Sequence, residues 1–155
     1  MHINSIILKP GQMKIINSDL LNKVSVSAKH NSRLRMNFNF HNSLDAKSQR
    51  MLNALEPGTE IPIHRHLNTY ENYIILRGKL KVLFYNDSHK LVNSVTLDSD
   101  IGNFGIEIPM GQWHSIEVLQ SGTVIFEVKD GPYCPIVEEN IKSNEHSRMN
   151  ETHYS

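Results

Sequence analysis

The sequence predicts an all-β domain, a sandwich or barrel of short strands that follows a single helix. From residue 34 onward, apolar and polar residues alternate over short runs, which is the period of a strand with one buried face. Residues that favour turns separate these runs. Before them, the apolar residues have helical spacing over about residues 19–30. Many short strands at this spacing are typical of a sandwich or a barrel.

The predicted helix over residues 19–30 has both a start signal and one apolar side. Either Asn17 or Ser18 can cap it, because a short polar side chain accepts a hydrogen bond from a free backbone N–H of the first turn. The apolar stripe consists of Leu20, Leu21, Val24 and Ala28. We expect this stripe to pack on the outside of the barrel.

The first predicted strand, over residues 34–41, has one apolar and one unusually polar face. The apolar face carries Leu34, Met36, Phe38 and Phe40. The polar face carries Arg35, Asn37, Asn39 and His41. Alternation does not say which face is turned inward. The polar face is therefore either part of a ligand site or the solvated side of an edge strand.

Further strands are predicted downstream, each bounded by turn residues. They cover about residues 50–56, 60–66, 71–77, 79–85, 91–97, 104–108, 114–119 and 123–129. The turns between them fall at Glu56-Pro57-Gly58, Arg77-Gly78-Lys79, Asn86-Asp87-Ser88, Pro109-Met110-Gly111 and Gln120-Ser121-Gly122-Thr123.

Four candidate metal ligands lie within these strands: His64, His66, Glu71 and His114. Side chains two residues apart on a strand share a face, so His64 and His66 point the same way. Glu71 follows far enough along the chain to return beside them on a neighbouring strand. The turn at 109–111 has proline and glycine chemistry and delivers His114 at the start of the next strand. The sequence therefore predicts one metal site.

Three imidazole nitrogens and one carboxylate oxygen form a borderline-hard ligand set. Such a set suits one divalent transition metal, Fe, Mn, Ni, Co or Zn, and does not suit Cu(I) or iron–sulfur clusters. It does not choose among the five metals. In an octahedral ion, four protein ligands leave about two positions open for ligand oxygens.

The four candidate ligands lie in two sequence motifs, here called frames, that resemble the two halves of the cupin signature. The first places the His-x-His pair and Glu71 between Gly58 and Gly78, and the second runs from Pro109 to His114. The runs 35–41, 49–59 and 126–133 are similar to the WbuC family of cupin-fold metalloproteins. The second frame has Asn103 where the general cupin pattern has glycine, and Val118 where it has asparagine.

The resemblance covers about residues 14–136 and implies the cupin double-stranded β-helix, a jelly roll. It also implies a small cytoplasmic bacterial protein that is often encoded among genes for O-antigen, lipopolysaccharide or other surface polysaccharide synthesis. No established reaction comes with it. Cupins often pair, so a homodimer is implied as well, while the residues themselves leave the oligomeric state open.

Length and composition set the limits for domains and partners. The 155 residues suit a single domain, predicted at 14–136, between a lead at 1–13 and a polar, mobile tail at 137–155. Sixteen basic residues balance sixteen acidic ones, so we expect neither nucleic acid nor a membrane surface as a partner. The start lacks the pattern of a signal peptide, and a single cysteine, Cys134, agrees with a reducing compartment. Both features favour the cytoplasm.

The expected ligand is a polar, anionic small molecule. Its candidate binding residues are Arg35, Asn37, Asn39, Gln49 and Arg50. Arginine suits carboxylate or phosphate, and asparagines suit hydroxyl-rich ligands such as sugars. His41 is the first candidate for general acid–base chemistry because histidine titrates near neutral pH. Tyr73, which shares a strand face with Glu71, is the second, although core filling also explains it.

Three functions remain open on this sequence. The first is a metal-dependent protein of surface polysaccharide biosynthesis that binds or acts on a sugar nucleotide or related carbohydrate, as an isomerase or epimerase if it is an enzyme. The second is an Fe(II) dioxygenase-like enzyme. The third is a non-catalytic module that binds a metal and a ligand. Fold alone does not choose among them, because jelly rolls of this kind host many chemistries.

Overall fold

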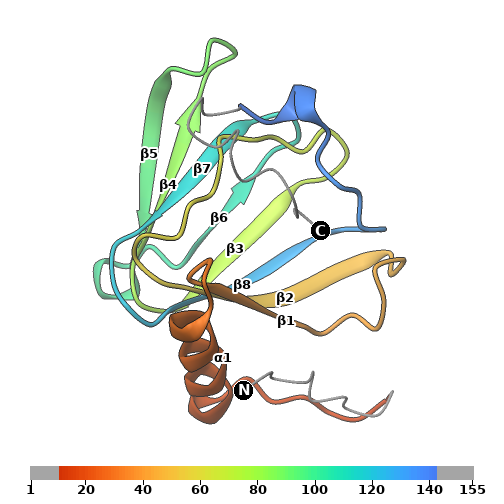
Figure 1. Cartoon of the computed structure of the whole chain (residues 1–155), viewed down its shortest axis with the longest axis vertical. Coiled ribbons are helices and arrows are strands. Elements are labelled where there is room, and N and C mark those ends of the chain that lie inside the picture. The colour runs from red at the N-terminus through yellow and green to blue at the C-terminus, as the bar shows by residue number, and fades with distance from the viewer. Residues whose placement is uncertain (1–10, 143–155) are drawn as a thin grey trace.

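A computed structural model of the protein describes residues 11–142 and shows two facing antiparallel sheets with one helix (Figure 1). The helix is α1 (Ser18–His30). The strands are β1 (Arg35–Asn39), β2 (Ser48–Leu55), β3 (Glu71–Arg77), β4 (Leu80–Tyr85), β5 (Leu91–Leu97), β6 (Gly105–Ile108), β7 (Trp113–Val118) and β8 (Thr123–Asp130). Two short 3-10 helices are η1 (Ser99–Ile101) and η2 (Glu138–Asn140). The predicted all-β class is confirmed.

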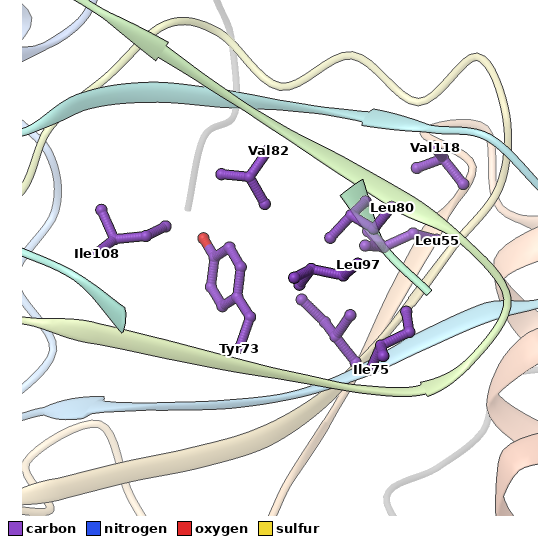
Figure 2. Close-up of a cluster of buried hydrophobic side chains, with 9 residues drawn as sticks. Leu55, Tyr73, Ile75, Leu80, Val82, Leu97, Ile108 and Val118 are labelled. Atoms are coloured by element: carbon purple, nitrogen blue, oxygen red, sulfur yellow. The ribbon is translucent and has the colours of Figure 1, made fainter. Parts of the chain in front are cut away.

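One sheet has five strands in the order β1-β2-β8-β3-β6, and the other has three in the order β5-β4-β7. The core between them contains side chains from both sheets, including Leu55, Ile75, Leu80 and Ile125. Figure 2 shows the ring of Tyr73 among apolar side chains of this core, including Ile75, Val82 and Ile108. We call the face of the five-stranded sheet that contacts this core its inner face.

The outer face of the same sheet packs against α1. Leu21, Val24 and Ala28 of the helix are buried against a second apolar cluster that includes Leu52 and Val124 (Figure 1). The helix begins after Asn17, whose side-chain oxygen accepts the backbone N–H of Leu20, as its sequence predicts. The expectation that the helix covers the outside of the barrel is therefore confirmed.

The register of β1 shows which way its polar face points. Asn37 lies opposite Asn53, and Asn39 lies opposite Met51, while Met36 and Phe38 pack with the α1 cluster. Residues directly opposite on paired strands share a sheet face. The polar face of β1 therefore lies on the inner face of the sheet. Because β1 is an edge strand, Asn37 and Asn39 are nevertheless exposed.

One sequence prediction about an element was wrong. Residues 60–66 form no strand and make only an isolated bridge at His64, because Pro62 has no N–H to donate to a ladder. Residues 137–142, the start of the predicted polar tail, pack against that segment. There the backbone of Asn140 accepts the Arg65 N–H at 3.0 Å, and Lys142 donates to Ile63 at 2.8 Å. The rest of the predicted tail, 143–155, lies outside the described residues.

No helix among the described residues is long and apolar enough to cross a membrane.

Candidate metal centre

The segment that carries His64 and His66 is held to β7 by its backbone. His64 and His114 exchange two backbone hydrogen bonds, at 3.0 and 2.9 Å, and Gly111 donates to the His66 carbonyl at 2.7 Å. These bonds bring the imidazole rings together, with the centroids of His64 and His114 4.3 Å apart and those of His64 and His66 5.2 Å apart. Three imidazoles thus converge although 60–66 is not a strand.

Glu71 is the first residue of β3 and lies on the inner face, almost fully buried. Its Oε1 is 2.8 Å from His66 Nε2 and 3.3 Å from His114 Nε2. Its Oε2 accepts a hydrogen bond from the Tyr73 hydroxyl at 3.0 Å. Burial alone would raise the pKa of Glu71, but the adjacent imidazoles of His114 and His66 hold it well below its ordinary value. Glu71 is therefore an anion in the interior of the fold.

Backbone carbonyls set the tautomers of two imidazoles. His64 Nδ1 lies 2.8 Å from the Pro62 carbonyl, and His114 Nδ1 lies 2.9 Å from the Gln112 carbonyl. A carbonyl can only accept, so each Nδ1 carries the proton and each Nε2 keeps a lone pair. This arrangement is typical of histidines that bind a metal through Nε2. Burial also lowers the pKa of His64 to about 4, which keeps its ring neutral near pH 7.

These residues fit a metal ion. The ligand atoms of His64, His66 and Glu71 all lie within 4.8 Å of one another, and His114 adjoins them through Glu71. His114 Nε2 is buried without a hydrogen-bond partner among the described residues, and it faces the buried Glu71 Oε1, whose contact at 2.8 Å is another imidazole nitrogen, His66 Nε2. Unpaired buried polar atoms are rare in folded proteins, and a cation between His114 Nε2 and Glu71 Oε1 would satisfy both.

A line of polar side chains extends from Glu71 across the inner face, and two of its members were missed by the sequence analysis. Glu127 on β8 lies opposite Tyr73, and its Oε2 accepts the side-chain amide of Asn53 on β2 at 2.9 Å. Asn53 in turn lies opposite Asn37. We call Tyr73, Glu127, Asn53 and Asn37 the polar row. It connects the metal ligands to the exposed edge strand.

The polar row includes an acid that is uncharged at neutral pH. Burial, followed by the charge of Glu71, raises the pKa of Glu127 to about 8. Burial also raises the pKa of Tyr73 well above its ordinary value. Tyr73, an acid–base candidate from the sequence, therefore keeps its proton and uses it to hold Glu71.

The structure separates His41 from the metal ligands. His41 follows β1, and its Nδ1 lies 3.0 Å from the backbone nitrogen of Arg50. Three strand spacings separate β1 from β3, or about 14 Å along the sheet. His41 thus lies at the far side of the inner face from Glu71.

The other predicted ligand-binding residues divide between the two faces. Asn37 and Asn39 lie on the inner face, as does Gln49, whose amide bonds the carbonyls of Leu44 and Ala46 at 3.3 and 2.8 Å. Arg35 also shares this face, and its guanidinium bonds the Glu60 carbonyl at 2.9 Å. Arg50 does not join them, because residues 50 and 52 share a face and Leu52 packs against α1. The fold therefore leaves Arg50 exposed on the outer face.

The residue between the two histidine ligands connects them to η2. Arg65 donates from Nε to the Asn140 side chain at 2.7 Å, and its guanidinium lies over the Trp113 ring at 4.6 Å. Asn140 is buried. Residues 137–142, which we call the strap, therefore pack against the segment that carries the ligands.

Comparison with known proteins identifies a family and a fold. Residues 16–97 match a family described as "Domain of unknown function (DUF6016)". No curated protein matches the chain.

Solved structures share the fold at low sequence identity. TT1209 from Thermus thermophilus has a TM-score of 0.55 and 18% identity over 76% of this chain and 97% of its own. The Schizosaccharomyces pombe Cnp3 cupin domain has a TM-score of 0.50 and 12% identity over 62% and 64%. The capsular polysaccharide assembling protein CapF from Staphylococcus aureus has a TM-score of 0.51 and 22% identity, over 59% of this chain and 25% of its own. The chain thus spans a quarter of CapF and under two thirds of the Cnp3 cupin domain. These matches agree with the predicted cupin jelly roll.

Proposed function

Because the chain belongs to the family described as a domain of unknown function (DUF6016), we propose its function from the site. It is a cytoplasmic metal-binding cupin of the WbuC type. It binds or acts on a sugar nucleotide or related carbohydrate in surface polysaccharide biosynthesis of the O-antigen, or lipopolysaccharide, type.

One observation carries the metal part of this proposal. Glu71 Oε1 lies 2.8 Å from His66 Nε2 and 3.3 Å from His114 Nε2, and His64 and His114 donate their Nδ1 protons to backbone carbonyls. The Nε2 lone pairs of His64 and His114 and the Glu71 carboxylate repel one another unless a cation lies between them. His64, His66, Glu71 and His114 would hold a divalent ion of Fe, Mn, Ni, Co or Zn, and such an ion polarises the oxygens of a bound ligand.

The carbohydrate part is supported by the amides on the inner face. Asn53 and the exposed Asn37 and Asn39 lie on the side of the sheet that carries Glu71. Side-chain amides donate and accept, which suits ligands rich in hydroxyl groups. The resemblance to the WbuC family supports the polysaccharide setting, and the name of CapF, which shares the fold, agrees with it.

A non-catalytic binding module is the second candidate, and the position of the acid–base groups favours it. His41 lies three strands from Glu71, and the Tyr73 hydroxyl donates a hydrogen bond to the Glu71 carboxylate. Neither is placed to move a proton on a ligand at the metal ligands. The polar row then serves to hold the ligand rather than to transform it.

Thermal-shift measurements test the ligand class. Metal-loaded protein with UDP-, dTDP- or GDP-sugars should melt at a higher temperature, and the shift should disappear in chelator-treated protein. The Asn39→Ala variant should show a smaller shift. Arg50→Ala is the matched control, because Arg50 lies on the outer face and should leave the shift unchanged. A shift that is equal with and without metal would contradict the proposal.

Product analysis separates the two candidates. The sugar nucleotide that gives the largest shift is incubated with metal-loaded protein and followed by NMR. An altered sugar supports the enzyme. An unchanged sugar over many hours, despite binding, supports the binding module.

A further inference from the structure

A lysine that the sequence analysis did not select lies beside the metal ligands. Lys129 on β8 is directly opposite Glu71 on β3 and opposite Gln49 on β2. Residues directly opposite share a sheet face, with Cβ atoms about 5 Å apart. Lys129 therefore lies on the inner face, next to Glu71, and its side chain is partly buried.

Within the described range 11–142 the positive charge of Lys129 acts on the nearby Glu127 carboxyl, where it lowers the pKa, but the ammonium forms no direct contact with a carboxylate. It makes no hydrogen bond there, and no carboxylate oxygen of that range lies within 4.0 Å of it. The neighbouring carboxyl groups contact other residues: Glu71 contacts Tyr73 and the imidazoles, and Glu127 accepts a hydrogen bond from Asn53. A lysine that is partly removed from water and forms no hydrogen bond to a protein group loses hydration that a bound anion would replace.

The other cations expected near a ligand are engaged or face away. Arg65 bonds Asn140 and lies over Trp113, and Arg35 bonds the Glu60 carbonyl. Arg50 lies on the outer face. The positive charge that the fold brings beside Glu71 is therefore that of Lys129.

We propose that Lys129 binds an anionic oxygen group, a carboxylate or a phosphate, of the small molecule held at the metal centre. The inference rests on the proposed metal site and names the residue that binds the anionic group of its ligand. A ligand that bridges the ion and the ammonium gains two electrostatic contacts in a partly dry site. A neutral sugar makes only the contact with the ion. The polar row then receives the hydroxyl groups of the same molecule.

Binding of simple anions to cobalt-loaded protein tests this proposal. Co(II) is added to chelator-treated protein, and its visible absorption reports oxygen ligands at the ion. Inorganic phosphate and lactate are titrated in parallel, so that the two arms distinguish phosphate from carboxylate. We expect at least one of them to change the spectrum of the wild type with saturation. Wild-type protein that holds Co(II) but binds neither anion would overturn the inference.

Substitutions of Lys129 test whether its positive charge is what binds the anion. Lys129→Met should weaken the binding of that anion about tenfold and leave the Co(II) content unchanged. Lys90→Met, which removes an exposed charge from the loop between β4 and β5, should bind the anion like the wild type. Lys129→Arg keeps the charge and should stay within about threefold of the wild type. Equal affinity in Lys129→Met, or equal losses in Lys129→Met and Lys129→Arg, would overturn the role of the charge.

The outcomes separate this inference from the proposed function. If the wild type binds no Co(II), the metal site itself is wrong. If it binds Co(II) and Lys129→Met binds the anions with unchanged affinity, the metal site stands and only the inference about Lys129 fails.

Discussion

Glu127 places a second carboxyl group beside a metal ligand without adding a second charge at neutral pH. Its side chain is buried on the inner face, accepts the Asn53 amide at 2.9 Å and lies across from Tyr73. Burial and the charge of Glu71 raise its pKa to about 8 from an ordinary value of 4.5. A second negative charge so close to Glu71 would repel it and disfavour the ionised form of both carboxyl groups.

Replacing Glu127 with glutamine should stabilise the metal-free protein at neutral pH. Between pH 4.5 and 8 the folded protein keeps the Glu127 proton, whereas the unfolded chain releases it. The free energy of unfolding of the wild type therefore falls as the pH rises through this window. Glutamine mimics the neutral acid, so Glu127→Gln should gain about 1 to 3 kcal/mol at pH 8.

Urea unfolding at pH 5 and pH 8 measures this difference. The advantage of Glu127→Gln should be small at pH 5 and large at pH 8. A difference that is constant between the two pH values, or that decreases at pH 8, would show that Glu127 is ionised in the folded protein. Glu107→Gln, at an exposed position on β6, is a suitable control.

The grouping of the four candidate metal ligands was predictable from the sequence, but their neighbours were not. His64, His66, Glu71 and His114 stand at spacings that two glycine- and proline-marked frames define, so local sequence was sufficient to nominate them. Glu127 and Lys129 have no such frame. Alternation puts them on one face of 123–129, but only the pairing with β3 shows that this face carries Glu71. Likewise, only the pairing of β2 shows that Arg50, selected as a ligand-binding candidate, lies on the outer face.

At the scale of elements, the strap shows how an irregular segment is fixed. Pro62 prevents a ladder at 60–66, and the backbone groups there are satisfied from two sides, by His114 of β7 and by Asn140 and Lys142 of the strap. Asn140 bonds Arg65 through both its backbone and its side chain. Sequence periodicity does not reveal this pairing, because the strap has neither helical nor strand spacing.

Asn140→Ala should loosen the segment that carries the histidines. It removes a buried acceptor from the Arg65 guanidinium, and such charge-assisted bonds contribute about 1.5 to 3 kcal/mol. We expect a loss of about that size in the free energy of unfolding, together with weaker Zn(II) binding in a competition with a chelating dye. The matched variant is Glu139→Ala, whose side chain is exposed in the same strap. Equal Zn(II) affinity in both variants would contradict a positioning role for the strap.

For the whole molecule, the β3–β4 connection, one of those that join the two sheets, depends on a glycine. Gly78 links β3 of the five-stranded sheet to β4 of the three-stranded sheet at φ +83°. An added Cβ would collide with the Thr123 hydroxyl and lie 2.7 Å from Thr123 Cα. Thr123 is not free to move, because its hydroxyl bonds the Gln120 carbonyl at 2.7 Å and accepts from Lys79 at 3.1 Å.

Gly78→Ala should therefore lower the free energy of unfolding by about 3 kcal/mol or more. Gly122→Ala provides a comparison, since Gly122 has φ +79° but no atom within 4 Å of an added Cβ. It should cost only about 1 kcal/mol, the strain of the backbone alone. If the two variants lose similar amounts of unfolding free energy in chemical denaturation, the contact with Thr123 is not what excludes a side chain at position 78.

The class of the whole fold followed from the sequence because alternation and turn residues agree over most strands. Predicted strands at 71–77 and 91–97 coincide with β3 and β5, and the helix begins one residue earlier than expected. The oligomeric state of the protein did not follow from the sequence. A homodimer stays a prediction, which light scattering of the purified protein tests through its mass.

Metal analysis of the purified protein tests the central claim most directly. The wild type, His64→Ala, His114→Ala and the control His30→Ala are loaded with Zn(II), freed of excess ion and measured by mass spectrometry of the elements. We predict about one ion per chain in the wild type and in His30→Ala, because His30 lies on α1, away from the site. His64→Ala and His114→Ala should each lose the ion while keeping the β-sheet circular dichroism of the wild type. Full metal content in either variant would contradict the four-ligand site.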